Sequence, residues 1–306
     1  MFRVMKLTYR NLFTDKNKID YSVVKNGSSQ FLCLQGKKTA ESRIKKAYMC
    51  ASFFYPELKE HFPEPISFNS DDENNLCTAL FSYSESGFLT DFLSVVPREW
   101  QYATGRKLGR ILKEMHSVSL TKSQNDKAVS RHERFMENLA EYISALPHFK
   151  NDKYALEALS QRFDNFGVFR TVMRYGSLNH GKVLITRDSS LIMLPSYTFG
   201  PGDACEDFAM LEFETAGLYP LFCAGVVDGY FSGVIPSVFW TRFALYCAMY
   251  SLWKSGKIAS KSKAMFIKMQ QNVDRIRDDF SDFQKPIPKW YSVAELKTIK
   301  AKARKL

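Results

Sequence analysis

Residues 172–185 read VMRYGSLNHGKVLI, and this stretch decides how the rest of the chain is interpreted. Gly176 and Gly181 bound a short polar loop, and an apolar strand follows it at 183–185. Loops of this kind often carry function, because a rigid scaffold positions their side chains. In this loop, however, the side chains that could do chemistry include Ser177 and Lys182 and no carboxylate.

The part of the chain far upstream of this loop predicts a small antiparallel sheet. Its strand-like segments, rich in β-branched and aromatic residues, are 2–13, 19–26, 29–35, 65–68 and 76–83. Asn26-Gly27 is a strong hairpin signal between the second and third segments. A helix is expected over 39–54, ending before Pro56. This order predicts a five-stranded sheet with one helix packed on it.

From residue 85 onward the sequence favours helices. Leu108, Ile111, Leu112 and Met115 fall at helical spacing. Two short strands around 181–195 are expected to form a hairpin through Asp188-Ser189, after which helices resume. The prediction is therefore an α+β, two-lobed fold. Its N-lobe covers 1–84, and its helical C-lobe covers 85–306 with the loop region 172–210 and a basic tail.

Composition limits the class of protein. The chain has 306 residues, 45% of them hydrophobic and 25% charged, as in soluble globular proteins. Asp228 and Arg242 divide the most apolar region, 216–253, into runs too short to span a bilayer, and the N-terminus has no signal-like apolar run. Six scattered cysteines with no CxxC pair predict buried free thiols and no zinc site. A cytoplasmic location is therefore expected.

Three segments, in order, resemble the aminoglycoside phosphotransferase and choline kinase group within the protein-kinase-like fold. GRILKEMHSV at 109–118 resembles the helix that precedes the catalytic region in that group. YGSLNHGKVLI at 175–185 resembles its His-Gly-Asp-Leu-His-x-Gly-Asn-Ile-Leu loop. LIMLPSYTFGPGDACEDFAML at 191–211 resembles its Ile-Asp-Phe-Glu segment followed by Gly-Asp-Pro-x-x-Asp-Leu-Ala. The resemblance implies the two-lobed kinase-like fold and covers nearly the whole chain.

The same resemblance implies that the catalytic groups have been lost. The base aspartate corresponds to Ser177, the metal-binding asparagine to Lys182, and the second metal ligand to Pro195. A hydroxyl is no base at neutral pH, an ammonium repels a divalent cation, and a proline side chain offers no ligand atom. The sequence therefore predicts a catalytically inactive phosphotransferase-like protein, a pseudokinase, with no metal and no cofactor expected.

Further losses are implied in the N-lobe. The segment 14–18, TDKNK, lacks the glycines that let a backbone approach phosphates. Cys33 or Leu34 stands where a phosphate-binding lysine is expected. Lys45 or Lys46 stands at the place of its glutamate partner, which Glu41 could supply only in another helix register.

Two interpretations of function remain open. In the first, the protein acts by binding a protein partner or an anionic small molecule, and ATP or GTP could bind without a metal. In the second, it is an active small-molecule kinase that phosphorylates a hydroxylated substrate through an unconventional site, with His180 as a weak candidate base. The candidate ligand-binding residues are Lys182, Asn179, Asp203 and Asp207.

Each candidate also has a structural interpretation. Lys182 could bind phosphate directly in place of a metal, or it could pair with Asp203 or Asp207 or be solvated, which we favour slightly. Asp203 and Asp207 are expected mainly to cap a helix and brace the loop. A site rebuilt from Asp203, Glu206 and Asp207 would have poor helical spacing. A lone histidine in a loop is more often a hydrogen-bonded structural residue than a base, and the same interpretation applies to His180.

The net charge of +11 favours anionic partners, and part of it lies in the tail ELKTIKAKARKL at 295–306. A basic amphipathic terminus is most often a solvated helix. Contact with nucleic acid is a weaker alternative. If the tail does bind nucleic acid, deleting residues 297–305 is expected to abolish this binding and leave the fold intact.

Overall fold

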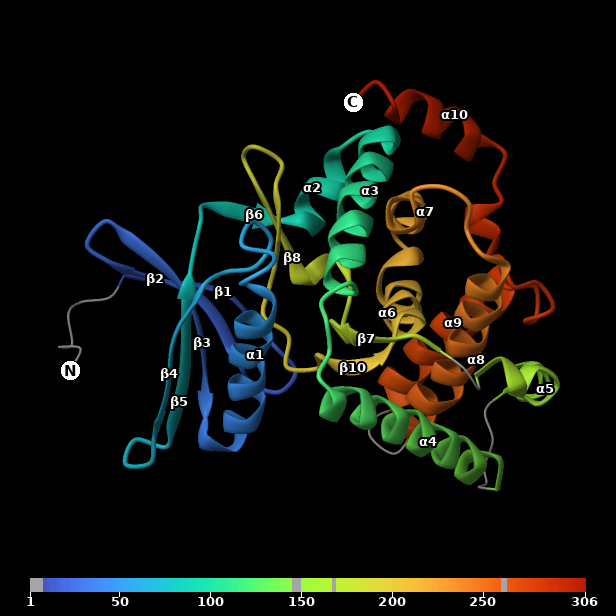
Figure 1. Cartoon of the computed structure of the whole chain (residues 1–306), viewed down its shortest axis with the longest axis horizontal. Coiled ribbons are helices and arrows are strands. Elements are labelled where there is room, and N and C mark those ends of the chain that lie inside the picture. The colour runs from blue at the N-terminus through green and yellow to red at the C-terminus, as the bar shows by residue number, and fades with distance from the viewer. Residues whose placement is uncertain (1–7, 145–149, 167–168, 260–262) are drawn as a thin grey trace. The chain divides into compact units, whose positions relative to one another are not determined.

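The computed structural model describes residues 8–144, 150–166, 169–259 and 263–306, and the chain divides into two compact units (Figure 1). The first unit comprises Met1–Phe92 and Gly181–Phe199, and the second comprises Leu93–His180 and Gly200–Leu306. An antiparallel sheet forms most of the first unit, and helices form most of the second. This combination confirms the predicted α+β class.

The sheet of the first unit has five strands in the order β1-β2-β3-β5-β4, and every neighbouring pair is antiparallel. These strands are β1 (Thr8–Thr14), β2 (Asp20–Asn26), β3 (Ser29–Lys37), β4 (Pro65–Asp71) and β5 (Leu76–Ser82). The predicted hairpin joins β2 and β3, where Asn26 pairs with Ser29 and Gly27 has a φ of +60°. Glycine is the residue that adopts this left-handed conformation without strain. The predicted segment 2–7 lies outside the described residues.

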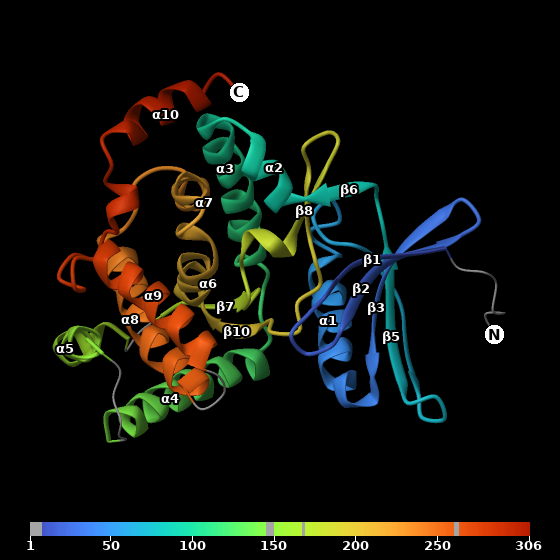
Figure 2. The same cartoon turned by 180° about the vertical axis from the view of Figure 1, so that it is seen from behind.

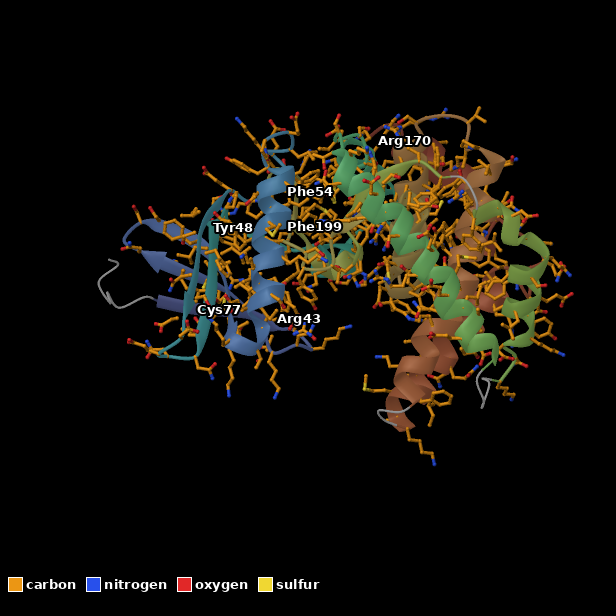
Figure 3. The ribbon with its side chains drawn as sticks, turned by 60° about the horizontal axis from the view of Figure 1, so that its bottom comes forward. Arg43, Tyr48, Phe54, Cys77, Arg170 and Phe199 are labelled. Carbon is orange, nitrogen blue, oxygen red and sulfur yellow. The ribbon has the colours of Figure 1, made fainter. Side chains whose placement is uncertain are left out.

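Helix α1 (Glu41–Phe54) covers one face of this sheet because both elements are apolar on one side. In β5 every second residue (Cys77, Ala79, Phe81) is buried, which is the period of a strand with one face on the core. Ile44, Ala47 and Ala51 on α1 pack into the same core. In Figure 3, Tyr48 and Cys77 lie between the helix and the sheet, while Arg43 extends from the exposed side of α1.

The hairpin of β8 (Val183–Thr186) and β9 (Leu191–Met193) belongs to the first unit, although it lies a hundred residues further along the chain. Strand β8 pairs with β6 (Ser86–Phe88), and Leu184 and Leu194 enter the apolar core of the first unit. The hairpin turns through Asp188-Ser189 as predicted, with Ser189 at a φ of +65°.

The expected division at 84/85 therefore differs from the one observed. The first unit reaches Phe92 and takes residues 181–199 out of the expected C-lobe. The physical reason is that pairing between β6 and β8, together with burial of their apolar side chains, joins segments that are distant in sequence.

The second unit consists of helices around a short two-stranded ladder of β7 (Thr171–Arg174) and β10 (Gly200–Asp203). Helix α2 (Leu89–Val95) crosses the division between the units. The helices of the second unit are α3 (Arg98–Met115), α4 (Lys122–Ser144), α5 (Lys153–Arg162), α6 (Ala204–Leu211), α7 (Pro220–Phe231), α8 (Ser237–Ala259), α9 (Lys263–Asp279) and α10 (Glu295–Ala303). A π-helical turn, Glu212–Ala216, follows α6 directly.

Helices α3 and α7 pack so closely that their backbones touch (Figures 1 and 2). Gly105 and Gly109 on α3 face Gly225 and Gly229 on α7, and each pair has the spacing Gly-x-x-x-Gly. A Cβ placed on any of the four would lie 2.1–2.2 Å from a backbone oxygen of the opposite helix. Only glycine fits at these positions.

The basic tail forms α10, and this helix is part of the second unit's packing. Leu296, Ile299 and Ala303 are buried, and α10 contacts α3. The Lys300 ammonium lies 2.7 Å from the Asp228 carboxylate of α7. The expectation that deleting 297–305 leaves the fold intact is therefore wrong, since deletion would uncover an apolar surface and remove one of the partners of the partly buried Asp228 carboxylate. Among the described residues, no helix combines the length and the apolar character needed to cross a membrane.

Candidate functional site

The loop at 175–182 is held by one buried carboxylate. Asp207, on α6, accepts hydrogen bonds from the backbone N–H of Tyr175 at 2.8 Å and of Gly176 at 2.6 Å. The His116 Nε2 atom lies 3.1 Å from the same carboxylate, and its Nδ1 atom lies 3.1 Å from the Tyr230 hydroxyl. Asp207 is fully buried, so its charge is satisfied by these internal donors.

Asp203 caps the helix that carries Asp207. Its carboxylate accepts from the Cys205 N–H at 3.0 Å, and Glu206 accepts from the Asp203 N–H at 3.3 Å, which together form a capping box. Asp203 is also paired with the Arg242 guanidinium. Asp203 and Asp207 thus both make internal contacts, one at the start of α6 and one with the loop.

Glu206 is engaged as well, so the three neighbouring acids do not face one another as a metal site would require. Its carboxylate lies 3.1 Å from the Arg174 guanidinium and accepts a hydrogen bond from the Tyr250 hydroxyl at 3.1 Å. Glu206 and Arg174 are both buried. In the part of the chain that the structure describes, no group of three or more His, Cys, Asp or Glu side chains could hold a metal ion.

The polar side chains of the loop mostly bond to the loop and to the π-helical turn. The Asn179 side-chain amide donates to the Ser177 carbonyl at 2.8 Å. The His180 Nδ1 atom lies 3.1 Å from the Thr215 hydroxyl, and its ring meets the Tyr219 ring edge-on at 5.1 Å. Burial lowers the pKa of His180, while the charge of Glu214 opposes this shift. Burial thus favours the neutral form of this imidazole.

Lys182 lies against two aromatic rings of the first unit. Its ammonium lies 4.6 Å from the centroid of the Tyr21 ring and 4.8 Å from that of Phe13, and the two rings stack 4.4 Å apart. Burial lowers the pKa of Lys182, and the negative charge of Asp15 raises it again. Aromatic faces attract an ammonium electrostatically, so the two rings and the carboxylate together hold this charge in place.

The remaining degenerate positions offer no substitute groups. Pro195 is buried just after β9, and Ser177 is partly exposed in the loop of the second unit. Leu34, at the position expected for a lysine, is fully buried in the apolar core of the first unit. Glu41 is the first residue of α1 and lies 3.2 Å from Lys38, so its pairing is local.

The turn that joins β1 to β2 is closed by Asp15, which was not among the residues predicted to form the site. Asp15 Oδ1 accepts hydrogen bonds from the N–H of Asn17 at 2.8 Å and of Ile19 at 3.0 Å. The Asn17 amide donates to the Tyr197 hydroxyl at 2.6 Å. A signal was available, since aspartate at the start of a polar turn commonly bonds the backbone two residues on.

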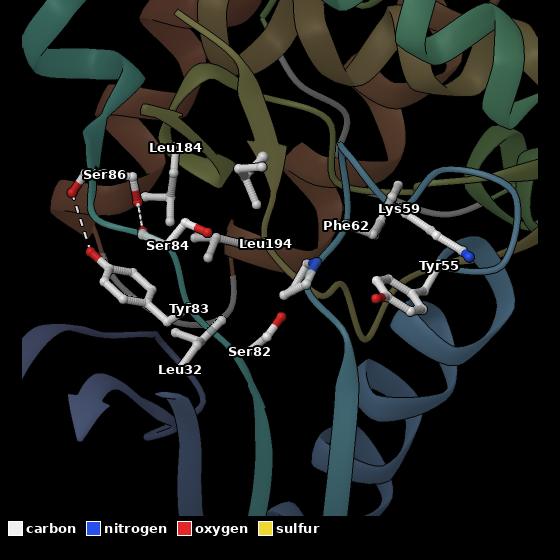
Figure 4. Close-up of a pocket in the computed structure, with 12 residues that line it drawn as sticks. Leu32, Tyr55, Lys59, Phe62, Ser82, Tyr83, Ser84, Ser86, Leu184 and Leu194 are labelled. Atoms are coloured by element: carbon white, nitrogen blue, oxygen red, sulfur yellow. Dashed lines mark hydrogen bonds between the residues drawn. The ribbon is translucent and has the colours of Figure 1, made fainter. Parts of the chain in front are cut away.

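A pocket of about 110 Å³ opens in the first unit (Figure 4). Leu32, Leu184 and Leu194 supply apolar lining, and Lys59 and Tyr55 supply polar groups. Figure 4 shows the hydrogen bonds of the adjoining segment, in which the Tyr83 hydroxyl donates to the Ser86 carbonyl at 3.2 Å and the Ser86 hydroxyl donates to the Ser84 carbonyl at 3.0 Å. No sequence motif pointed to this pocket, because its lining comes from five separate segments.

Solved structures with the same architecture include phosphotransferases and kinases. The GDP and kanamycin complex of APH(2″)-IIia matches with a TM-score of 0.64 and 13% identity, over 91% of this chain and 95% of that one. The chain has the fold of the aminoglycoside phosphotransferases. An aminoglycoside-3′-phosphotransferase of type VIII matches with a TM-score of 0.56 and 12% identity, over 81% of this chain and 94% of that one.

The aminoglycoside phosphotransferase fold is shared more widely than those two enzymes. A choline/ethanolamine kinase family protein from Mesorhizobium loti matches with a TM-score of 0.58 and 11% identity, over 98% of this chain and 93% of that one. No protein-family model and no curated protein sequence matches the chain. At this level of identity the comparison establishes the fold, and the function has to be argued from the site itself.

Proposed function

We propose that this protein does not transfer phosphate by the usual route of the aminoglycoside phosphotransferase fold, and that it acts by binding a protein partner or an anionic ligand. Lys182 is the observation that carries the proposal. At the position that the sequence resemblance assigns to a metal ligand, it supplies an ammonium that lies against Phe13 and Tyr21. A fixed positive charge there repels Mg²⁺ and attracts an anion.

The magnitudes of the missing contributions support the proposal. A general base contributes about 10²–10⁴-fold to a rate, and Ser177 cannot act as one at neutral pH. A metal ion adds several kcal/mol of stabilisation to the transferring group, and neither Lys182 nor Pro195 can ligate it. Asp203 and Asp207 do not compensate, because both are buried in contacts that hold the loop and α6.

Two features of the protein are suited to ligand binding, namely a pocket and a positive net charge. The pocket of about 110 Å³ combines an apolar lining with polar groups, as ligand sites commonly do. A net charge of +11 favours anionic partners over cationic ones. ATP and GTP are anionic, so they are suitable first probes of binding and should be tested with and without a metal.

The test is a thermal-shift titration with ATP and GTP, each in Mg²⁺ and in EDTA, together with a measurement of nucleotide consumption. A ligand present at 100 times its dissociation constant stabilises the folded state by about 2.7 kcal/mol, which raises the midpoint by a few degrees. We expect any shift to persist in EDTA and no consumption of nucleotide. Mg²⁺-dependent consumption in the presence of a hydroxylated acceptor would contradict the proposal.

The competing function is an active small-molecule kinase with an unconventional site. One feature favours it, namely that burial lowers the pKa of His180, which favours the neutral imidazole that a base requires. Against it, the His180 ring nitrogen already lies 3.1 Å from the Thr215 hydroxyl. If turnover is found, replacing His180 with Gln should abolish it, while the neighbouring exposed substitution Arg187→Gln should not.

A further inference from the structure

The pocket of about 110 Å³ in the first unit has a largely apolar lining. Leu32, Leu184 and Leu194 line it and are buried, and so is Phe62. All twelve lining residues belong to the first unit, so one compact body defines the shape of the pocket. An apolar cavity of about 150 Å³ binds benzene. The pocket is therefore suited to an apolar group no larger than one ring.

The polar groups of the lining segment 82–86 are bonded to the chain itself (Figure 4). The Tyr83 hydroxyl donates to the Ser86 carbonyl at 3.2 Å, and the Ser86 hydroxyl donates to the Ser84 carbonyl at 3.0 Å. The Ser82 hydroxyl accepts from the Glu64 N–H at 2.8 Å, and the Ser82 N–H donates to the Glu64 carbonyl at 2.9 Å. Polar ligand atoms would have to compete with these bonds, so this segment favours contact with an apolar part of a ligand.

Lys59 and Tyr55 supply polar groups of another kind, at the end of the pocket opposite Tyr83 (Figure 4). Lys59 is exposed, and among the described residues that line the pocket it is the one with a charge. Within the described part of the chain, neither the Lys59 nor the Tyr55 side chain forms a hydrogen bond or an ion pair. An ammonium and a phenol hydroxyl can both donate to a carboxylate. This end of the pocket is therefore suited to the acidic group of a ligand.

We propose that this pocket binds a small carboxylic acid whose apolar part is a single ring or a short branched chain. The apolar part lies against Leu32, Leu184 and Leu194, and the carboxylate accepts from the Lys59 ammonium and the Tyr55 hydroxyl. A nucleoside is too large, because pockets for ligands of that size measure about 300 Å³ or more. This inference rests on the proposed function, because it names the class of anionic ligand that the protein binds.

The experiment measures the affinity of the full chain for benzoate by ligand-observed NMR. A single-ring acid has few atoms, so a Kd on the order of 1 mM is expected. Two substitutions locate the binding. Ser84 is exposed although it lines the pocket, so Ser84→Phe fills the pocket without replacing a core residue and should weaken benzoate binding about tenfold or more. Lys59→Met removes the ammonium and should weaken binding about threefold to fivefold, as for a partly exposed ion pair.

The matched control is Lys45→Met, because Lys45 is an exposed lysine of the same unit that does not line the pocket. It should bind benzoate like the wild type, and unchanged thermal midpoints confirm that the variants fold. Benzoate binding that withstands both Ser84→Phe and Lys59→Met would overturn the inference, as would no binding at all or an equal loss in Lys45→Met. Lys59→Met keeps the test valid if Ser84→Phe does not fold.

Two comparison compounds test the class of ligand, counting only the binding that Ser84→Phe removes. Benzylamine keeps the ring and reverses the charge, and adenosine is a nucleoside without charge. We expect benzylamine to bind about fivefold or more weakly than benzoate, because the Lys59 ammonium repels it, and adenosine not to bind in the pocket. Equal binding of either compound would overturn the inference.

The two proposals can fail separately. Mg²⁺-dependent nucleotide consumption by the wild type contradicts the proposed function. An inactive wild type whose benzoate binding is the same in Ser84→Phe and Lys59→Met contradicts only the assignment of the pocket to a small carboxylic acid.

Discussion

Among single residues, Glu212 has an unusual environment for a carboxylate. It begins the π-helical turn, is almost fully buried, lies 2.6 Å from Arg275 and accepts a hydrogen bond from the Trp290 indole at 2.8 Å. Burial raises its pKa from 4.5 to about 7, although Arg275 opposes the shift. Asp279, which shares Arg275, adds to the increase. The ion pair therefore does not recover the full cost of removing the carboxylate from water.

Glu212 makes the stability of the protein depend on pH near neutrality. Between pH 4.5 and about 7 the folded state keeps the Glu212 proton that the unfolded state has lost, so stability falls as pH rises through this window. One group contributes a slope of at most about 1.4 kcal/mol per pH unit. Urea unfolding of the wild type and Glu212→Gln at pH 5, 6 and 7 should give a shallower decline for the variant. Equal declines would show that Glu212 titrates normally.

At the scale of elements, the contact of α3 with α7 depends on four glycines. Each one lies where a Cβ would collide with the opposite backbone, and a rigid backbone cannot move aside as a flexible side chain can. The contact also positions Asp228 on α7, which accepts from the Tyr102 hydroxyl of α3 and pairs with Lys300 of α10. Three helices of the second unit are thus fixed through one interface.

A single methyl group at this interface should destabilise the protein. Gly109→Ala places a Cβ 2.1 Å from the Val226 carbonyl oxygen, and overpacking of this kind typically costs about 1–3 kcal/mol. Alanine is otherwise the better helix former, so helix propensity acts in the opposite direction. Thermal unfolding should show a midpoint several degrees lower than that of the wild type. Gly233→Ala, where a Cβ meets open space, should unfold like the wild type.

For the whole molecule, the excess of 43 Lys and Arg over 32 Asp and Glu predicts binding to polyanions that weakens with salt. Lys302 and Lys305 are exposed on and beside α10, so they can be changed without disturbing its buried face. Reversing both to Glu should leave the unfolding midpoint unchanged. If nucleic acid contacts the tail, the slope of log affinity against log salt should fall by roughly 1.4 for single-stranded RNA. The same reversal at Lys25 and Lys37, on exposed strand positions, is the control.

The sequence predicted the features that depend on local chemistry. The Asn26-Gly27 hairpin, the turn at Asp188-Ser189 and the cap at Asp203 each follow from conformational preferences within a few residues. It could not predict contacts between distant segments. The pairing of β6 with β8 is one such contact, and the stacking of Lys182 on Phe13 and Tyr21 is another. The contacts of Asp15 were not predicted, because the N–H groups of Asn17 and Ile19 converge on its carboxylate only in the folded chain.

The late position of the β8–β9 hairpin in the sequence affects how the first unit folds during synthesis. A chain emerging from the ribosome has made all five strands of the first sheet by Ser82, yet Leu184 and Leu194, which complete the core beneath them, emerge a hundred residues later. The core of the first unit therefore stays incomplete, and its apolar surface stays exposed, until the chain has been translated beyond residue 194. Exposed surface of this kind is what chaperones bind. Fragments ending near Phe92 should aggregate for the same reason, and circular permutants that bring residues 181–199 forward should fold sooner.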